Sequence, residues 1–294
     1  MNRLLNTISR EMRMPSVLLC VLSLGAYVLL SRPTYADRSA RRLLSIVGPD
    51  LIVLDIIQTV DPILLVGGFL IAWWRVTAIK QNGNMSRAEL FTTVGALSLI
   101  LLGTVGLVTL FLIVAYAPEH GLPRGMPLPI LTAVTFGYIT TCVSVGAATG
   151  VVTSRSVLGR IGAFVVFIGS LFFQIFVNLF YTLLRNQRPN LFQQPADPLL
   201  FFFHRVGLFQ LYNVLTNWIY DIGNSSSPAR ITVRQLQPAA DRLVTNAFIA
   251  EHTFGTDVPW FLSAWVSAVV LALWLGVSLA VLSVYGSNEQ TDQT

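Results

Sequence analysis

The sequence predicts an all-α membrane protein, a bundle of six helices that each cross a lipid bilayer. Composition is the first reason, because 54% of the residues are hydrophobic and only 11% are charged, whereas soluble domains carry about 25% charged residues. The second reason is a series of six long apolar segments, several of which exceed the roughly 20 residues that a helix needs to cross the hydrocarbon core. These segments are residues 15–30, 51–74, 91–116, 128–152, 161–184 and 260–285.

Length and charge predict one transmembrane domain over residues 1–294 and no separate soluble domain, because loops and tails account for the rest of the chain. The net charge of +5 comes from 19 basic residues, which are spread along the chain and lie mostly near the ends of the apolar segments. This pattern favours membrane lipids as partners and excludes nucleic acid. Cys20 and Cys142 both fall inside apolar segments and are expected to pack as small hydrophobic residues.

Residues 1–14 predict an amphipathic elbow helix that lies flat on the membrane and leads into an uncleaved first span. As a helix, this stretch gathers its apolar side chains within about 100° of arc and its arginines on the opposite side. The apolar stripe consists of Met1, Leu4, Leu5, Ile8 and Met12, and the basic side of Arg3, Arg10 and Arg13. The stripe would enter the acyl boundary while the arginines reach lipid phosphates. An unstructured basic tail is the alternative.

Basic residues in the short loops predict the orientation, because such loops tend to keep Lys and Arg in the cytoplasm. With the N-terminus inside, the inner segments hold eight basic residues and the short outer loops five, as counted along the sequence. The prediction is a multi-pass protein of the cell membrane whose N- and C-termini are both cytoplasmic.

The long segment 185–259 is then extracytoplasmic. Within it, residues 199–222 are rich in aromatic side chains but are interrupted by polar ones such as Asn213 and Asp221, which makes a lipid-exposed crossing costly. We expect re-entrant or interfacial helices here. A seventh crossing, which would place the C-terminus outside, is the alternative. Asn224 begins a glycosylation sequon in this segment.

The sequence carries no recognisable catalytic or metal-binding motif. The only lysine, Lys80, lies outside any phosphate-binding loop pattern, and the chain has neither a His-Glu-x-x-His helix nor a Gly-x-Ser-x-Gly turn. Glu119-His120 and Glu251-His252 could approach one another outside the membrane, but solvated loop residues are the simpler interpretation. We therefore expect no enzyme activity, no metal and no cofactor in this chain.

Polar residues inside the apolar segments are candidate functional residues. Asp55 and Asp61 lie in the second segment on opposite helical faces. Asp61 is a candidate proton relay, or an interface residue paired with an arginine of residues 38–42. Gln174 and Asn178 lie one helical turn apart in the fifth segment, where they either line a polar path or bond neighbouring helices.

Gly146 and Gly150 form a Gly-x-x-x-Gly pattern in the fourth segment. Small residues at this spacing let two helix backbones approach closely, so the pattern predicts a helix-packing face. The sequence leaves open whether the partner is another helix of the same chain or a second copy.

Three short motifs and the order of the segments together suggest a family. The motifs are residues 81–91 (QNGNMSRAELF), 152–156 (VTSRS) and 260–265 (WFLSAW). They resemble the permease subunits of type-2 ABC transporters, which are six-span exporters, and in particular their archaeal copper-maturation-like group. One departure is that residues 75–83 lack the acidic residues that the family usually carries there.

The resemblance implies a permease that works with a separate ATP-binding cassette subunit and with a second permease copy, as a homo- or heterodimer. Residues 75–90 would form a coupling loop that includes a short coupling helix. Ser86, Arg87 and Phe91 would seat that helix in a groove of the ATP-binding subunit. Closure of two such subunits around ATP would then tilt the bundles between inward and outward states.

By the same analogy, the translocation path would pass between the second and fifth segments, beside Asp61, Gln174 and Asn178. The expected function is to move an unidentified substrate across the cytoplasmic membrane with ATP hydrolysed by the partner. The first alternative is a nucleotide-independent membrane scaffold or assembly factor. A membrane-embedded enzyme is the second, and the missing catalytic motifs disfavour it.

Overall fold

The computed structural model describes the bundle and its N-terminal helix. The described residues are 2–15, 17–18, 21–23, 25–26, 50–81, 86–122, 127–153, 161–162, 165, 169, 202, 206–219 and 259–291. Within these ranges every regular element is a helix and there is no strand. The all-α prediction is therefore confirmed for this part of the chain.

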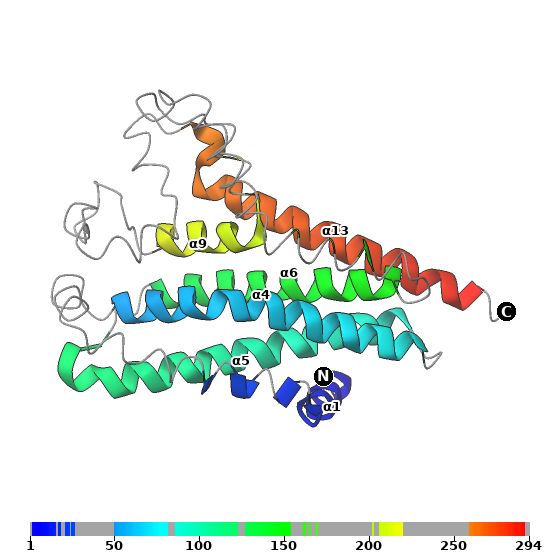
Figure 1. The fold of residues 1–294 in the computed structure, drawn as a ribbon, viewed down its shortest axis with the longest axis horizontal. Coiled ribbons are helices and arrows are strands. Elements are labelled where there is room, and N and C mark those ends of the chain that lie inside the picture. Colours follow the sequence, from blue (N-terminus) through cyan, green and yellow to red (C-terminus); the bar gives the residue numbers. More distant parts are fainter. Residues whose placement is uncertain are drawn as a thin grey trace.

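Within the described residues, four long helices form the bundle, and two short ones pack against it (Figure 1). The long helices are α4 (Asp50–Gln81), α5 (Arg87–His120), α6 (Pro127–Thr153) and α13 (Ala264–Thr291). The short helices are α1 (Asn2–Met12) and α9 (Leu208–Ile219), and a 3₁₀ turn, η3 (Trp260–Leu262), precedes α13.

Each long helix contains a stretch that is long and apolar enough to cross a membrane. These stretches are Ile63–Gln81, Arg87–Ala115, Leu128–Thr153 and Ala264–Tyr285. By length and composition these four helices are compatible with a multi-pass membrane protein, and each is the counterpart of one of the six predicted spans. Half of the predicted span 15–30 and most of the predicted span 161–184 lie outside the described residues. The last crossing begins at Ala264 rather than Trp260, because residues 260–262 form the separate turn η3.

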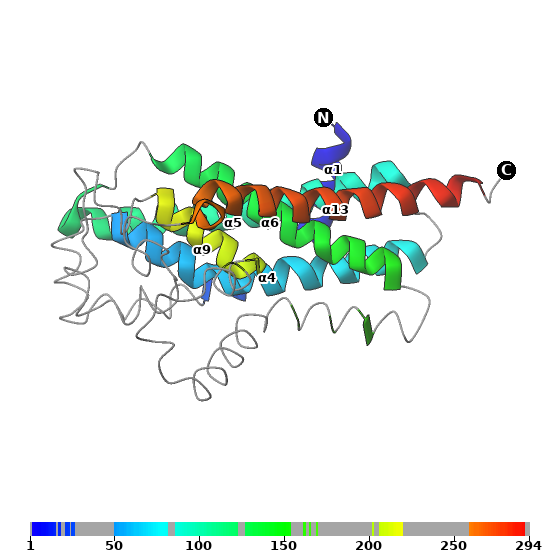
Figure 2. The same cartoon turned by 90° about the horizontal axis from the view of Figure 1, so that it is seen from above.

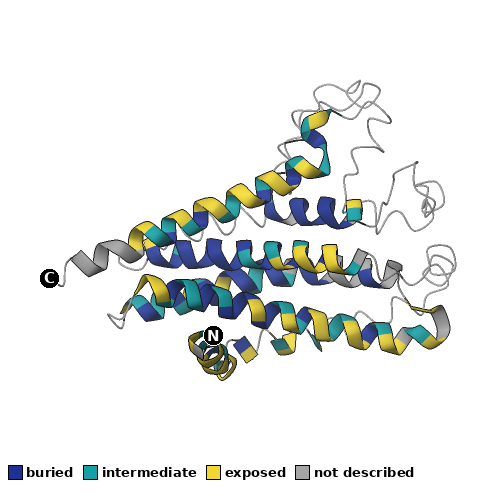
Figure 3. Cartoon of the chain, turned by 180° about the vertical axis from the view of Figure 1, so that it is seen from behind, coloured by how far each residue is buried: buried dark blue, intermediate teal, exposed yellow. Residues whose placement is uncertain are grey.

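Helix α6 is the centre of the bundle. It contacts α4, α5, α9 and α13, and residues 141–148 are buried without interruption. Helix α13, by contrast, keeps many apolar side chains exposed, as Figure 3 shows along its length. Apolar residues around the whole circumference are typical of helices that face lipid on one side and protein on the other.

Helices α4 and α6 run in the same direction and touch through their backbones. A Cβ atom added to Gly146 would collide with the carbonyl oxygen of Phe69, and one added to Gly150 would lie 2.8 Å from that of Trp73. The Gly-x-x-x-Gly pattern thus faces another helix of the same chain, a choice that the sequence left open.

Helix α1 lies across the bundle rather than along it (Figure 1) and packs on α5. Leu4 lies close to Gly95 of α5, and Ile8 packs against the hydrophobic core. Seen from above, α1 and the C-terminal part of α13 are found toward the same end of the bundle (Figure 2). The helix predicted for residues 1–14 is present over Asn2–Met12.

Helix α9 is too short for a full crossing, since its 12 residues span about 18 Å. It contacts α4, α6 and α13, and residues 210–216 are all buried. Helix α9 is one of the helices expected within residues 199–222, and their re-entrant or interfacial placement stays a prediction. Most of the remainder of that stretch lies outside the described residues.

The backbone contact between α4 and α6 predicts that Gly146→Ala destabilises the protein by about 2 kcal/mol, because the added methyl group forces the helices apart. Gly103→Ala in α5 is the matched control, since a Cβ there meets nothing within 4 Å and alanine favours the helix. Thermal unfolding in detergent, followed by circular dichroism, measures both. Equal midpoints for the two variants would contradict the close contact.

Candidate functional site

The first candidate site is a buried polar group centred on Asp61 of α4. The Asp61 side chain is fully buried, and the side-chain amide of Asn213 in α9 donates a hydrogen bond to its Oδ2 at 3.2 Å. Tyr138 of α6 lies beside Asp61, and Cys142 follows one turn later on α6. A carboxyl group at this depth is expensive unless polar neighbours surround it, and here two neighbouring helices supply them.

Two tyrosines extend this group. The rings of Tyr138 and Tyr212 stack with their centroids 4.3 Å apart and their planes 10° from parallel. The Tyr212 and Thr135 hydroxyls share a hydrogen bond of 2.8 Å. We refer to Asp61, Thr135, Tyr138, Cys142, Tyr212 and Asn213 as the Asp61 cluster. It fixes α9 to α4 and α6, because polar side chains from all three helices meet there.

The cluster offers polar contacts rather than a catalytic arrangement. Carboxyl, phenol, hydroxyl and amide groups can donate or accept hydrogen bonds to a polar ligand or can hold a proton. Among the described residues, no group of three or more His, Cys, Asp or Glu side chains is placed to hold a metal ion. The Glu119-His120 and Glu251-His252 pairing cannot be followed, because residues 251 and 252 lie outside the description.

The second candidate site is a group of charges where α1 meets α4 and α5. Glu11 of α1 is fully buried, and the Nε of Arg75 in α4 lies 2.9 Å from its carboxylate. Arg10 also contacts Glu11 at 3.2 Å and reaches Glu89 of α5 at 3.5 Å. We call Arg10, Glu11, Arg75 and Glu89 the α1 clamp, since it joins the N-terminal helix to two membrane-spanning helices.

The residues of the expected coupling element lie beside the α1 clamp. Ser86 caps the N-terminus of α5, and its hydroxyl accepts a hydrogen bond from the backbone N–H of Glu89 at 3.2 Å. Arg87, the first residue of α5, is exposed. Phe91 is half-buried and packs against the core.

The expected coupling loop over residues 75–90 is divided between two long helices. Residues 75–81 are the last turns of α4, and residues 87–90 are the first turn of α5. The cap at Ser86 sets the start of α5 at Arg87, and the coupling role of Ser86, Arg87 and Phe91 stays a prediction. Only residues 82–85 remain for the connection, and they are outside the described residues.

Lys80 strengthens the same end of the bundle. Its ammonium group donates a hydrogen bond to the backbone carbonyl of Val151 at 2.7 Å and lies 5.9 Å from the centre of the Tyr285 ring. Helix C-terminal carbonyls carry partial negative charge, so a cation there is favourable. Lys80 thereby ties α4 to the last turn of α6 and to α13.

The proposed path residues are only partly brought together. Asp61 lies in the Asp61 cluster, whereas Gln174 and Asn178 fall outside the described residues. Asn213 is the partner that the structure shows for Asp61. The arginines of residues 38–42, which we expected to pair with it, lie in a part of the chain that is not described, as does the side chain of Asp55.

The sequence analysis did not identify Glu11 and Asn213 as site residues, although the sequence pattern indicates both. Seven steps of 100° place Glu11 on the same helical face as Leu4, so an acid interrupts the apolar stripe of α1. Gln210, Asn213 and Asn217 fall on one face of α9 by the same geometry. A polar residue within an apolar face indicates a specific partner in the interior.

No protein-family model and no curated protein matches this chain. The functional argument therefore rests on the residues and their geometry.

The α1 clamp predicts unequal effects for its two acids. Glu11→Gln should lower the free energy of unfolding by about 2 kcal/mol, because it removes the buried charge that faces Arg75. Glu89→Gln should cost less than about 1 kcal/mol, since its ion pair is longer and exposed. Denaturant unfolding in micelles measures both variants, and a larger loss for Glu89→Gln would show that the clamp is misassigned.

The Tyr212 hydroxyl provides a second test. Tyr212→Phe and Thr135→Val each remove one end of their hydrogen bond while the stacked ring stays in place. A double-mutant cycle of unfolding free energies should give a coupling of about 1 kcal/mol. Additive effects would mean that the two hydroxyls do not interact.

Proposed function

We propose that this chain is the transmembrane permease subunit of an ABC transporter. In this proposal it moves an unidentified substrate across the cytoplasmic membrane, a separate ATP-binding cassette subunit hydrolyses the ATP, and a second permease copy completes the complex. The observation that carries the proposal is the α1 clamp, which holds an amphipathic helix across the bundle next to the α4–α5 connection. This arrangement gives a partner protein a firm point of attachment.

The α1 clamp suggests how a partner could move the bundle. A force applied at residues 82–87 would act on the end of α4 and the start of α5 together. Since Glu11 bonds Arg75 of α4, and Arg10 contacts Glu89 of α5, α1 would move with both helices. ATP binding can shift the equilibrium only if the partner fits one of the two states better.

Charge supports a cytoplasmic location for this end. Five basic residues lie on α1 or directly after it, on the last turns of α4 or at the start of α5, namely Arg10, Arg13, Arg75, Lys80 and Arg87. Lys and Arg concentrate in cytoplasmic segments next to membrane-spanning helices. Both termini would then be cytoplasmic, because α13 ends on the same side of the bundle.

We propose that the side chains of the Asp61 cluster line part of the translocation path. It places hydrogen-bonding groups between α4, α6 and the short helix α9. Short helices that end within the membrane are typical of substrate sites in transporters. Gln174 and Asn178 would line the same path from the proposed fifth span.

The test is co-expression with an ATP-binding cassette subunit, for which a Walker-type ATPase in a neighbouring reading frame would be the first choice. The wild-type chain should purify in a complex with the ATP-binding subunit, and the ATPase activity of that subunit should depend on the permease. Arg87→Glu should lower that activity at least about fivefold, because an exposed charge at the docking point is reversed. Arg3→Glu, an equal charge change away from the connection, is the control. Phe91 is a poorer position for this substitution, because its partly buried ring also packs against the core and its loss would destabilise the fold.

A complex that forms normally and keeps full ATPase activity with Arg87→Glu would contradict the assigned coupling residues. Purification with a partner that lacks a nucleotide-binding loop, together with indifference to ATP, would contradict the permease proposal and favour the membrane scaffold.

A further inference from the structure

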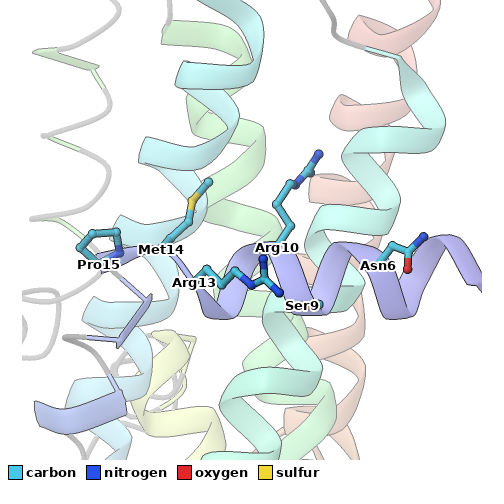
Figure 4. A pocket seen from close by; sticks show the side chains of 6 residues that line it. All are labelled: Asn6, Ser9, Arg10, Arg13, Met14 and Pro15. Carbon is cyan, nitrogen blue, oxygen red and sulfur yellow. The ribbon is translucent and has the colours of Figure 1, made fainter.

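We propose that α1 and the turn after it form a binding site for the headgroup of one anionic phospholipid. The site is an open depression of about 490 Å³ lined by Asn6, Ser9, Arg10, Arg13, Met14 and Pro15. Figure 4 shows all six side chains, and the first three belong to α1 while the last three follow it directly. The Arg13 side chain extends along α1 toward Ser9. This inference does not depend on the transport function.

Four polar residues line the depression at helical spacing. Asn6, Ser9, Arg10 and Arg13 are spaced at i, i+3, i+4 and i+7, the first three on α1 and Arg13 directly after it. An amide, a hydroxyl and two guanidinium groups therefore line one depression, with Arg10 extending toward the long helices and Arg13 along α1 (Figure 4). Guanidinium groups bind phosphate oxygens with paired, charge-assisted hydrogen bonds, and the neutral groups suit the hydroxyl and ester oxygens of a headgroup.

The charge balance leaves a positive site. Among the described residues, the ion pairs here join Arg10 and Arg75 to Glu11 and Glu89, while Arg13 adds a third positive charge. Arg13 is exposed and takes part in none of the ion pairs found among the described residues. One unbalanced positive charge matches the single negative charge of a phosphodiester. Arg10 can contribute as well, because its five N–H groups exceed those used by the two acids.

The apolar surroundings favour a lipid over free phosphate. Met14 and Pro15 form one side of the depression, and Leu18 and Leu22 continue beyond it, one turn apart and 50% and 59% exposed. The backbone N–H of Leu18 donates to the carbonyl of Met14 at 3.0 Å, which makes the chain helical again directly after the depression. Acyl chains could lie along these leucines while the phosphate meets the arginines.

The experiment uses the full-length protein in mild detergent with equimolar phosphatidylglycerol and phosphatidylcholine of identical acyl chains. Native mass spectrometry measures the lipid that stays bound. Wild type should retain mainly phosphatidylglycerol, and Arg13→Gln should reduce that retention about fivefold. Arg3→Gln is the matched control, since it removes the same charge from the same helix outside the depression, and it should stay within about twofold of wild type.

Three results would overturn the proposal. Equal loss for Arg3→Gln and Arg13→Gln would indicate general attraction to a basic helix. Equal retention of the two lipids would remove the requirement for an anionic headgroup. Displacement of phosphatidylglycerol by a large excess of inorganic phosphate would indicate a phosphate site that does not need the lipid. Thermal unfolding of both variants verifies that each remains folded.

Discussion

The structure depends on the contact between α4 and α6. Positions four residues apart on one helix lie in a row, and two such rows face one another here. On α6 the row is Tyr138, Cys142, Gly146 and Gly150, and on α4 it is Asp61, Leu65, Phe69 and Trp73. The glycines bring the two backbones together toward one end of the row. At the other end the tyrosine and the aspartate meet in the Asp61 cluster. The polar cluster is thus a continuation of the packing seam.

The two ends of the bundle handle polar groups in different ways. Near Asp61, the neutral side chains of Tyr138 in α6 and Asn213 in α9 contact the carboxyl group. At the opposite end, charges meet charges, as in the pairing of Glu11 with Arg75, and Lys80 bonds a helix terminus. Neutral partners suit the interior of a membrane protein, where charges are costly. Full charges suit an end that reaches the headgroup region and water.

Much of the fold could be predicted from the sequence, because long helices that are apolar on all sides have few alternatives in lipid. The helix at residues 2–12 could be predicted as well, since its two faces differ so clearly. The residue pairs that join these helices could not be predicted from the sequence. Glu11 interrupts an apolar stripe, but its pairing with Arg75 requires α1 to pack on α5 close to the end of α4, which sequence spacing does not reveal. Asn213 was considered only as an obstacle to a crossing. The coupling role of Ser86 to Phe91 came from a family resemblance, whereas the cap at Ser86, which starts α5, is a local feature of the sequence.

The glycine contact also limits how the protein can change shape. Where backbone lies against backbone, few side chains can change rotamer to absorb a small displacement, so gradual sliding of α6 along α4 would meet carbonyl groups at once. The next register that restores the fit is one helical turn away, about 5.4 Å. The pair therefore behaves as a single stiff rod under modest forces. Rearrangement is left to the surfaces around it, where α13 and α5 meet the rod through ordinary, adjustable side chains.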